Sequence, residues 1–144
     1  MSNYSYLVEE AKNDGISRFV VGAVVSSTSK VLLLKRPKND FMGGIYELPS
    51  GKVEEGESLD DALSREVIEE TGIVITEIKN YLGYFDYESK TGRKTRQFNF
   101  LVVGQEPIEI ILQEHDEYVW VSPSQFDSYP VTDSVKETIG QIIK

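Results

Sequence analysis

The stretch from Ser58 to Gly72 constrains the fold most, because it predicts a helix with carboxylates on its apolar face. Ser58 can cap this helix at its start, and Gly72 can end it. A helix turns by about 100° per residue. On that spacing the apolar face consists of Leu59, Ala62, Leu63 and Val67. Glu66 and Glu70 then fall within this face, and Glu69 falls at its edge.

Ionised glutamates at the boundary of a core need a compensating charge. Arg65 cannot neutralise three carboxylates, and it points about 100° away from Glu66. Either some of the glutamates are protonated, or a multivalent cation lies among them. Carboxylate oxygens suit hard ions, Mg²⁺ or Mn²⁺ above all. The alternative is a helix that frays or tilts and leaves its glutamates in water.

The rest of the chain predicts a mixed α/β layer fold. A short leading helix should end at Gly15, and residues 38–50 should form a long loop after Pro37. Two continuous β-rich runs, 18–25 and 31–36, indicate strands buried on both faces. Further strands are predicted at 74–85, 95–103 and 118–121, and an amphipathic helix at 131–144.

Composition limits the partners and the chemistry. The chain has 144 residues with 15 basic and 24 acidic side chains, so its formal charge is 15 − 24 = −9, which argues against broad nucleic-acid binding. The absence of cysteine excludes disulfides, thiolate metal sites and thiol nucleophiles. The longest apolar run, 19–25, is too short to span a bilayer, and the N-terminal residues do not resemble a signal peptide. We expect a soluble, cytoplasmic protein with no membrane partner.

Residues 51–73, GKVEEGESLDDALSREVIEETGI, resemble the signature motif of the Nudix hydrolases, with every defining position filled. The resemblance implies an α/β/α sandwich, with a mixed β-sheet between helices, and a single Nudix domain over residues 1–144. It also implies that Mg²⁺ or Mn²⁺ supports hydrolysis of a nucleoside diphosphate linked to another group. Such an ion screens the phosphate oxygens and lowers the pKa of bound water.

The resemblance further implies roles for individual residues. Three side chains match the metal-binding glutamates: Glu66, Glu69 and Glu70. The carbonyl of Ser50 is expected to be a further metal ligand, although many relatives have glycine there and a positive φ would strain a serine. Arg65 matches the arginine that orients the glutamates. Glu57 matches a glutamate that supports the ligands from behind or is itself an additional ligand.

Outside the motif the candidate residues are less specific. Glu114 is our candidate for the general base and Glu117 the second, with a solvated acidic turn as the alternative. His115, the only histidine, is interpreted as a polar surface residue. The basic residues Arg93, Lys94 and Arg96 are expected in solvent because they follow a turn.

Substrate contacts must also come from outside the motif. Lys35 and Arg36 could meet phosphate oxygens, or form a simple pair of charges at a strand end. Phe41 and Tyr46 could stack on a nucleobase. So could three aromatic residues of the following strand: Tyr84, Phe85 and Tyr87. The alternative for each aromatic residue is a place in the core.

The leading functional interpretation is a metal-dependent pyrophosphohydrolase of the MutT-like group. It would convert a nucleoside triphosphate, or a modified one, to the monophosphate and pyrophosphate. One alternative is a non-catalytic Nudix domain that serves as a nucleotide sensor or interaction module. Another is a hydrolase of ADP-ribose, a dinucleoside polyphosphate or capped RNA. The expected partner is a small nucleotide rather than a nucleic acid, and a monomer and a homodimer both stay open.

Overall fold

The computed structural model describes residues 4–39, 43–106, 110–112 and 114–142. Its first half contains α1 (Ser5–Asn13), β1 (Arg18–Ser27), β2 (Lys30–Lys35), β3 (Tyr46–Glu47), β4 (Ser50–Lys52) and α2 (Leu59–Thr71). Its second half contains β5 (Val74–Glu88), β6 (Lys94–Gln105), β7 (Glu117–Val121), the 3₁₀ helix η1 (Pro123–Ser128) and α3 (Asp133–Gly140). No helix among the described residues is both long and apolar enough to cross a membrane.

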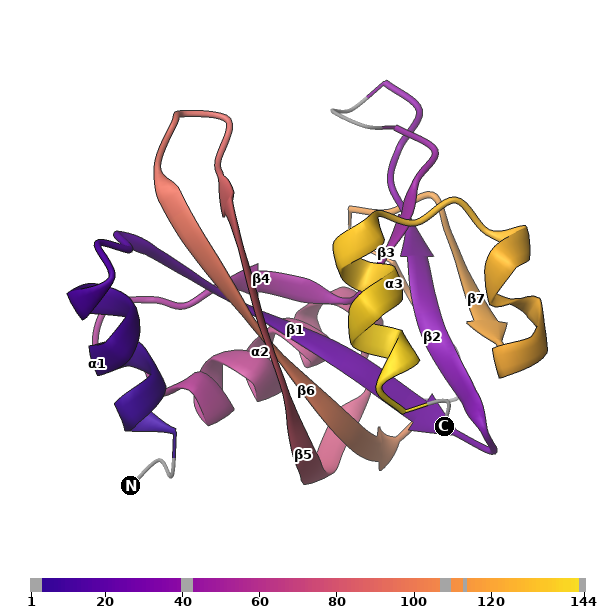
Figure 1. Ribbon diagram of the computed structural model, residues 1–144. Coiled ribbons are helices and arrows are strands. Elements are labelled where there is room, and N and C mark those ends of the chain that lie inside the picture. Colours follow the sequence, from indigo (N-terminus) through magenta and orange to yellow (C-terminus); the bar gives the residue numbers. More distant parts are fainter. Residues whose placement is uncertain (1–3, 40–42, 107–109, 113, 143–144) are drawn as a thin grey trace.

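The strands of the described ranges form one mixed sheet around β1 (Figure 1). β1 runs parallel to β6, and β6 pairs with the long antiparallel strand β5. The other edge of β1 is shared: β4 pairs with residues 20–22, and β2 pairs with residues 26–27. β3 and β7 continue the sheet from β2. The division of β1 places the short strand β4 next to α2.

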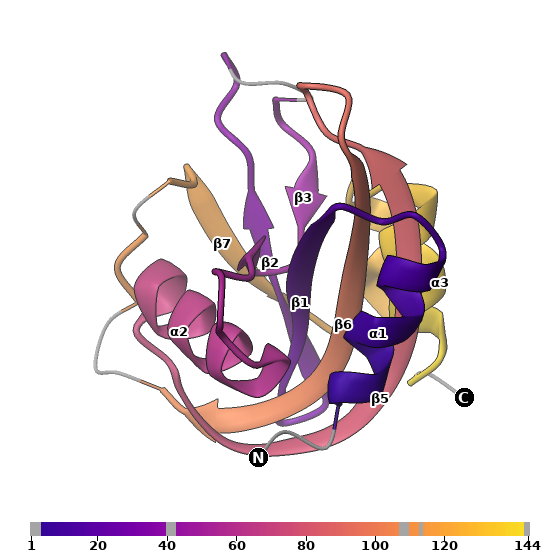
Figure 2. The same cartoon turned by 90° about the vertical axis from the view of Figure 1, so that its left-hand side faces the viewer.

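The two faces of β1 pack against different helices. Val21, Ala23 and Val25 belong to the core cluster that includes side chains of α1 and α2. Val24 belongs to the second cluster, with side chains of η1 and α3. Figure 2 shows α2 and α3 on opposite sides of β1 and β6. The expected sandwich, with a mixed sheet between helices, is therefore confirmed, and β1 is buried on both faces as predicted.

Several predicted boundaries were wrong. Residues 38–50 are not all loop, because β3 and the first residue of β4 lie among them. The closing helix is shorter than predicted: it begins after Thr132, whose Oγ1 accepts a hydrogen bond from the Val135 N–H at 3.3 Å, and α3 extends to Gly140. The β5 strand extends to Glu88, three residues beyond the prediction. Ile143, expected on the apolar side of the closing helix, lies outside the described residues.

Arg96 was expected in solvent, and the structure buries it within β6. Only 3% of the residue is exposed. Its guanidinium donates two hydrogen bonds to Asp86, at 2.7 and 3.0 Å, and lies 3.0 Å from a carboxylate oxygen of Asp14. It also stacks over the Tyr84 ring, 3.8 Å from the ring centroid. This cluster ties β6 to β5 and to the end of α1, and it explains why an arginine is tolerated there.

We predict that Arg96→Ala lowers the free energy of unfolding by about 2 to 3 kcal/mol, because it removes charge-assisted hydrogen bonds from a buried position. Lys79→Ala, which truncates a half-exposed lysine on β5, is the control and should change stability by less than about 0.5 kcal/mol. Chemical denaturation of both variants measures the difference. Equal losses in the two variants would contradict a structural role for the Arg96 cluster.

Candidate active site

The helix α2 has the form that its sequence predicts. The Ser58 hydroxyl accepts a hydrogen bond from the Asp61 N–H, and Gly72 ends the helix with φ of 80° in the left-handed region. The side chain of Glu70 is 8% exposed and that of Glu66 is 16% exposed, whereas Glu69 is 56% exposed. Two carboxylates therefore lie on the inward face and the third at its edge, and a frayed helix is excluded.

Arg65 is held against several glutamates at once. Its Nε and Nη2 donate to both carboxylate oxygens of Glu57, at 2.7 and 2.9 Å. Its Nη1 donates to Glu66 at 2.7 Å and to Glu69 at 3.3 Å. The hydrogen bonds from Arg65 lower the pKa of Glu57, so that carboxylate stays ionised. Glu57 and Arg65 thus form a rigid support that orients the neighbouring glutamates.

The Glu66 carboxylate lies directly against Gly51 of β4. A Cβ atom on Gly51 would fall 1.9 Å from the Glu66 carboxylate carbon, so any larger residue would displace it. Burial raises the pKa of Glu66 despite the opposing effect of Arg65. The glycine therefore creates a gap that a carboxylate fills.

Glu70 bridges α2, β4 and the loop before β7. One of its oxygens accepts a hydrogen bond from the Ser50 N–H at 2.7 Å, and the other lies 3.4 Å from Nδ1 of His115. Burial raises the pKa of Glu70 to about 8, against the lowering effects of His115 and the Ser50 N–H. Without a bound cation, this carboxylate is costly to ionise.

His115 is a site residue that the sequence interpretation missed. Its side chain is 7% exposed, and Nε2 lies 2.7 Å from a Glu47 oxygen whose partner oxygen accepts from Arg36 at 3.1 Å. Burial opposes its protonation, but the Glu47 hydrogen bond and the charges of Glu70 and Glu47 together raise its pKa. A single histidine in a loop has no periodic pattern, so only the fold shows that it joins Glu47 to Glu70.

Four carboxylates line one cavity of about 360 Å³ beside β4: Glu66, Glu69, Glu70 and Glu114. Ser50 also lines it, and it lies in a regular strand outside the positive-φ region, so the serine is not strained. Within the described ranges, no three acidic or histidine side chains converge closely enough to enclose an ion as they stand. The donor set is nevertheless entirely oxygen, as Mg²⁺ and Mn²⁺ prefer, and the gap at Gly51 already holds a carboxylate. The residues present fit a hard divalent cation.

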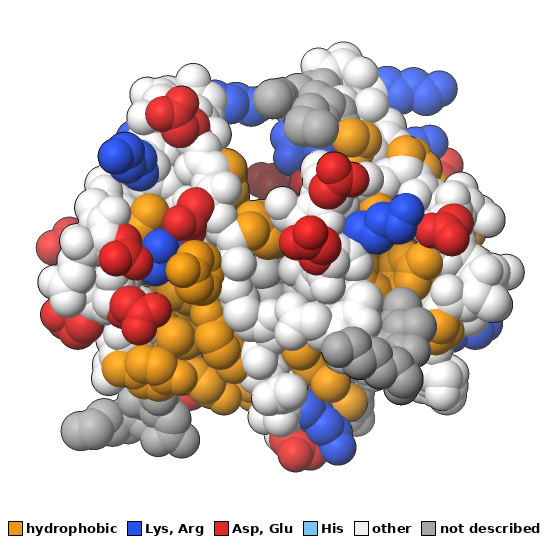
Figure 3. Space-filling model, in the orientation of Figure 1, with side chains coloured by type: hydrophobic (Ala, Val, Ile, Leu, Met, Phe, Trp, Pro, Cys, Tyr) orange, Lys and Arg blue, Asp and Glu red, His pale blue; other side chains and the backbone are white. Residues whose placement is uncertain are grey.

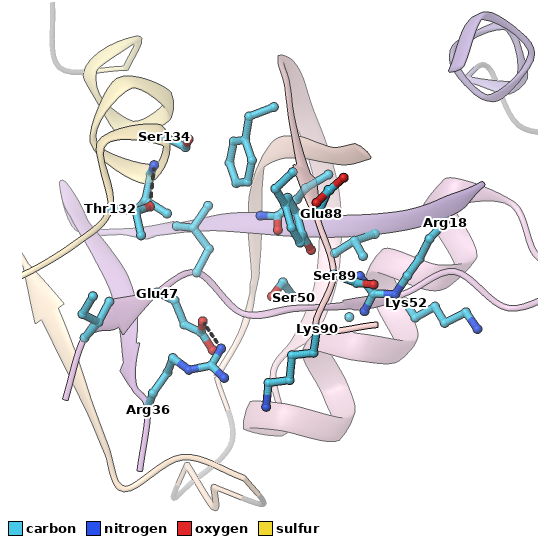
Figure 4. A pocket seen from close by; sticks show the side chains of 18 of the residues that line it. Arg18, Arg36, Glu47, Ser50, Lys52, Glu88, Ser89, Lys90, Thr132 and Ser134 are labelled. Carbon is cyan, nitrogen blue, oxygen red and sulfur yellow. Dashed lines mark hydrogen bonds and ion pairs between the residues drawn. The ribbon is translucent and has the colours of Figure 1, made fainter. Parts of the chain in front are cut away.

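A larger cavity of about 910 Å³ adjoins the first, and the two share five lining residues: Ser50, Gly51, Lys52, Glu70 and Glu114. Figure 3 shows the molecule hollowed between the β5–β6 hairpin and the loop after β2. Five basic residues line the larger cavity: Arg18, Arg36, Lys52, Lys90 and Arg93. Figure 4 shows Arg36 with Glu47 on one wall and Lys90 entering from the hairpin. The cavity thus has an acidic end next to the glutamates of α2, and its walls carry these five basic residues together with Glu47 and Glu88, in a protein of net charge −9.

Other predicted residues fall in different places. Glu114 is exposed at the junction of the two cavities. Its negative charge contributes to the raised pKa of Glu66. Glu117 lies on β7, where it accepts from the Tyr46 hydroxyl at 3.3 Å, and neither is among the described residues that line the cavities. Tyr46 instead packs edge-on against Tyr129, with ring centroids 5.1 Å apart. Phe41 lies outside the described residues.

We predict that the metal-free protein loses stability relative to Glu70→Gln as the pH rises from about 5 to about 8. The pKa of Glu70 is raised from 4.5 to about 8 in the folded state, so its contribution to stability is full below pH 4.5 and is lost towards pH 8. His115, whose pKa is also raised, acts in the same direction. Melting temperatures in a chelator measure this difference.

Glu69→Gln is the matched control, because that side chain is more than half exposed on the same helical turn.

Stabilisation of the unmutated protein by Mg²⁺ should grow over the same pH range, since protons and the cation compete for Glu70. Parallel melting curves for wild type and Glu70→Gln at every pH would contradict the assignment of Glu70 as a costly buried carboxylate.

Known proteins of one family are similar to this chain over most of its length. The NUDIX domain family model matches residues 17–140. A CTP pyrophosphohydrolase of Escherichia coli strain K12 is 31% identical over 112 residues, covering 78% of this chain and 81% of that protein. The nucleoside triphosphatase NudI of Escherichia coli is 29% identical and covers 85% of this chain and 94% of its own length.

A solved structure agrees with the sequence relatives. The crystal structure of a MutT NUDIX hydrolase from Burkholderia pseudomallei has a TM-score of 0.72 and 25% sequence identity, covering 87% of this chain and 97% of that one. The family model spans more than half of the chain and includes α2, β4 and the loop that carries Glu114 and His115. This chain therefore belongs to the Nudix family, has MutT-like relatives, and is a hydrolase that acts on the pyrophosphate bonds of nucleotides.

Proposed function

We propose that this hydrolase converts a nucleoside triphosphate, or a modified one, to the nucleoside monophosphate and pyrophosphate with the help of Mg²⁺ or Mn²⁺. The observation that carries the proposal is a cluster of glutamates at one end of a cavity that five basic residues also line. Two of the relatives are described as acting on nucleoside triphosphates or on CTP. The larger cavity, of about 910 Å³, is of the size that commonly holds one small ligand.

The basic residues of the cavity suit the phosphate chain. Arg36, Lys52 and Arg93 reach the cavity from separate elements, so they can contact different phosphoryl groups at the same time. Arg36 is also held by Glu47 at 3.1 Å, which fixes its guanidinium before substrate arrives. These cations draw an anionic nucleotide into a protein that is acidic elsewhere.

The glutamates of α2 would hold the divalent cation. Glu66 and Glu70 lie beside β4, the strand that carries the Ser50 carbonyl. Glu69 can turn towards them from the edge of the helix. When bound, the cation supplies screening of the phosphate oxygens and lowers the pKa of a coordinated water. Arg65 and Glu57 act as positioning residues, because they contact the glutamates rather than the cavity.

Glu114 is our candidate for the general base. It lies where the acidic and basic parts of the cavity meet, and it is exposed enough to accept a proton from a water molecule. Cleavage breaks the bridge between the first and second phosphoryl groups: the oxygen of water joins one phosphorus, and the bridging oxygen leaves with the other. The proton taken by Glu114 passes to solvent through the open side of the cavity.

A panel of substrates tests the proposed function. Canonical and oxidised nucleoside triphosphates, ADP-ribose, dinucleoside polyphosphates and capped RNA are each incubated with and without Mg²⁺. Release of monophosphate and pyrophosphate from a triphosphate, with kcat/KM near or above about 10⁴ M⁻¹s⁻¹, is the expected result. Faster turnover of another substrate class would replace the proposal, and no turnover of any substrate would favour a nucleotide sensor.

We predict that Glu69→Gln and Glu70→Gln each lower kcat by about 10²- to 10³-fold, because each removes a charged ligand of the cation. The fold should survive, since glutamine keeps the size of the side chain. Glu77→Gln, on the exposed part of β5, is the control and should retain full activity. Wild-type rates for both α2 variants, measured at limiting Mg²⁺, would overturn the proposed metal site.

A further inference from the structure

Two buried amides interrupt an apolar face of the sheet. Gln97 is 7% exposed and Asn99 is fully buried, and both lie on β6. Their neighbours on the same face of β1, by register, are Val20 and Gly22. Buried amides reduce stability unless they are hydrogen-bonded, so this pair needs an explanation beyond packing.

Gly22 makes room for the pair. A Cβ atom on Gly22 would lie 2.4 Å from Nε2 of Gln97 and 2.5 Å from Oδ1 of Asn99. The backbone conformation of Gly22 does not require glycine, because its φ is not positive. The glycine is therefore explained by the space that the two amides occupy.

Asn99 fixes the orientation of Gln97. Nε2 of Gln97 donates to Oδ1 of Asn99 at 2.9 Å, and Nδ2 of Asn99 lies 3.5 Å from the Gln97 carbonyl. This hydrogen bond uses one of the two N–H groups of the Gln97 amide. Within the part of the chain that the structure describes, Oε1 and the second N–H make no hydrogen bond, and Gln97 lines the larger cavity while Asn99 does not. Gln97 thus has an acceptor and a donor left for a ligand, in an orientation set from behind.

The sheet supplies an aromatic surface next to this amide. Phe85 is paired with Gln97 across β5 and β6, so the two side chains project from the same face. Both line the cavity, and Phe85 is half-buried there. Ser50 and Lys52 extend the same rows of the sheet on β4, opposite Gly22 and Val20. The face that carries Phe85 and Gln97 therefore continues to Ser50 and Lys52 on β4, and the glutamates of α2 line the cavity beside that strand.

We propose that Gln97, oriented by Asn99, determines base specificity by hydrogen-bonding the edge of the substrate's nucleobase, which packs against Phe85. This inference rests on the proposed function. A base with an amino group beside a ring nitrogen and one with a keto group beside a ring N–H present donor and acceptor in opposite order. An amide held in one orientation forms both hydrogen bonds with one of these two base edges. With the other edge its N–H faces a donor and its oxygen faces an acceptor, so both hydrogen bonds are lost. It therefore discriminates amino from keto bases.

The test compares substrates that differ in this edge: CTP with UTP, and ATP with ITP. In the wild type, kcat/KM should favour one member of at least one pair by about 5- to 150-fold, as expected for a two-bond contact to a base edge. Gln97→Met, which keeps the length of the side chain but removes both hydrogen bonds, should bring that ratio to within about threefold. Asn99→Leu should also lower the ratio, although Gln97 is retained, because the amide is then free to rotate.

Gln105→Met is the matched control, since Gln105 is exposed at the end of the same strand, and it should keep the wild-type ratio. Melting temperatures show whether each variant folds, and Gln97→Glu, of nearly identical shape, replaces Gln97→Met if that variant does not. An unchanged ratio in folded Gln97 variants would overturn the inference while leaving the proposed function in place.

The two proposals can fail separately. Absence of triphosphate turnover in the wild type would overturn the proposed function, whatever the role of Gln97. Calorimetric binding of CMP, UMP, AMP and IMP without Mg²⁺ then tests the amide by itself. An amino-to-keto preference that Gln97→Met abolishes would support the inference, and equal affinities in wild type and variant would overturn it.

Discussion

The burial of the Glu70 carboxylate against β4 is the interaction on which the rest of the site depends. It joins α2 to the Ser50 N–H at 2.7 Å and approaches His115 in the loop before β7. A buried carboxylate is unfavourable to ionise, and its pKa is raised to about 8. Arg65 cannot relieve this cost, because it is engaged with Glu57, Glu66 and Glu69. The pKa stays raised although His115 and the Ser50 N–H lower it, so a cation beside this carboxylate would favour its ionised form.

The sheet connects this acidic end to the place where a base would lie. The split of β1 between β4 and β2 puts Ser50 and Lys52 in register with Gly22 and Val20. β6 then adds Asn99 and Gln97 to the same two rows. Because neighbouring strands present paired residues on one face, Ser50 and Lys52 share the face of the buried amides, whereas Gly51, against which Glu66 lies, belongs to the face that packs on α2. The registers of β1 with β4 and with β6 therefore determine which side chains face the cavity.

Much of this arrangement could be predicted from local pattern. The helical period placed Glu66 and Glu70 inward, and the motif spacing identified α2 and Gly51 together. What the sequence could not show depends on contacts between distant segments. His115 is 68 positions from its partner Glu47, and Arg96 is 82 positions from Asp14. Gln97 and Asn99 cannot be distinguished from ordinary strand residues in the sequence, because their contact with Gly22 depends on the pairing of β1 with β6.

The most direct measurement is a titration of isotopically labelled protein with Mn²⁺, followed by the broadening of backbone amide signals. We predict that broadening begins at Ser50, Gly51 and residues 66–70, and that Glu70→Gln weakens it sharply. Mg²⁺ should reverse it by competition. Broadening centred on another part of the surface, or an unchanged response in Glu70→Gln, would contradict the claim that the buried glutamates of α2 form the cation site.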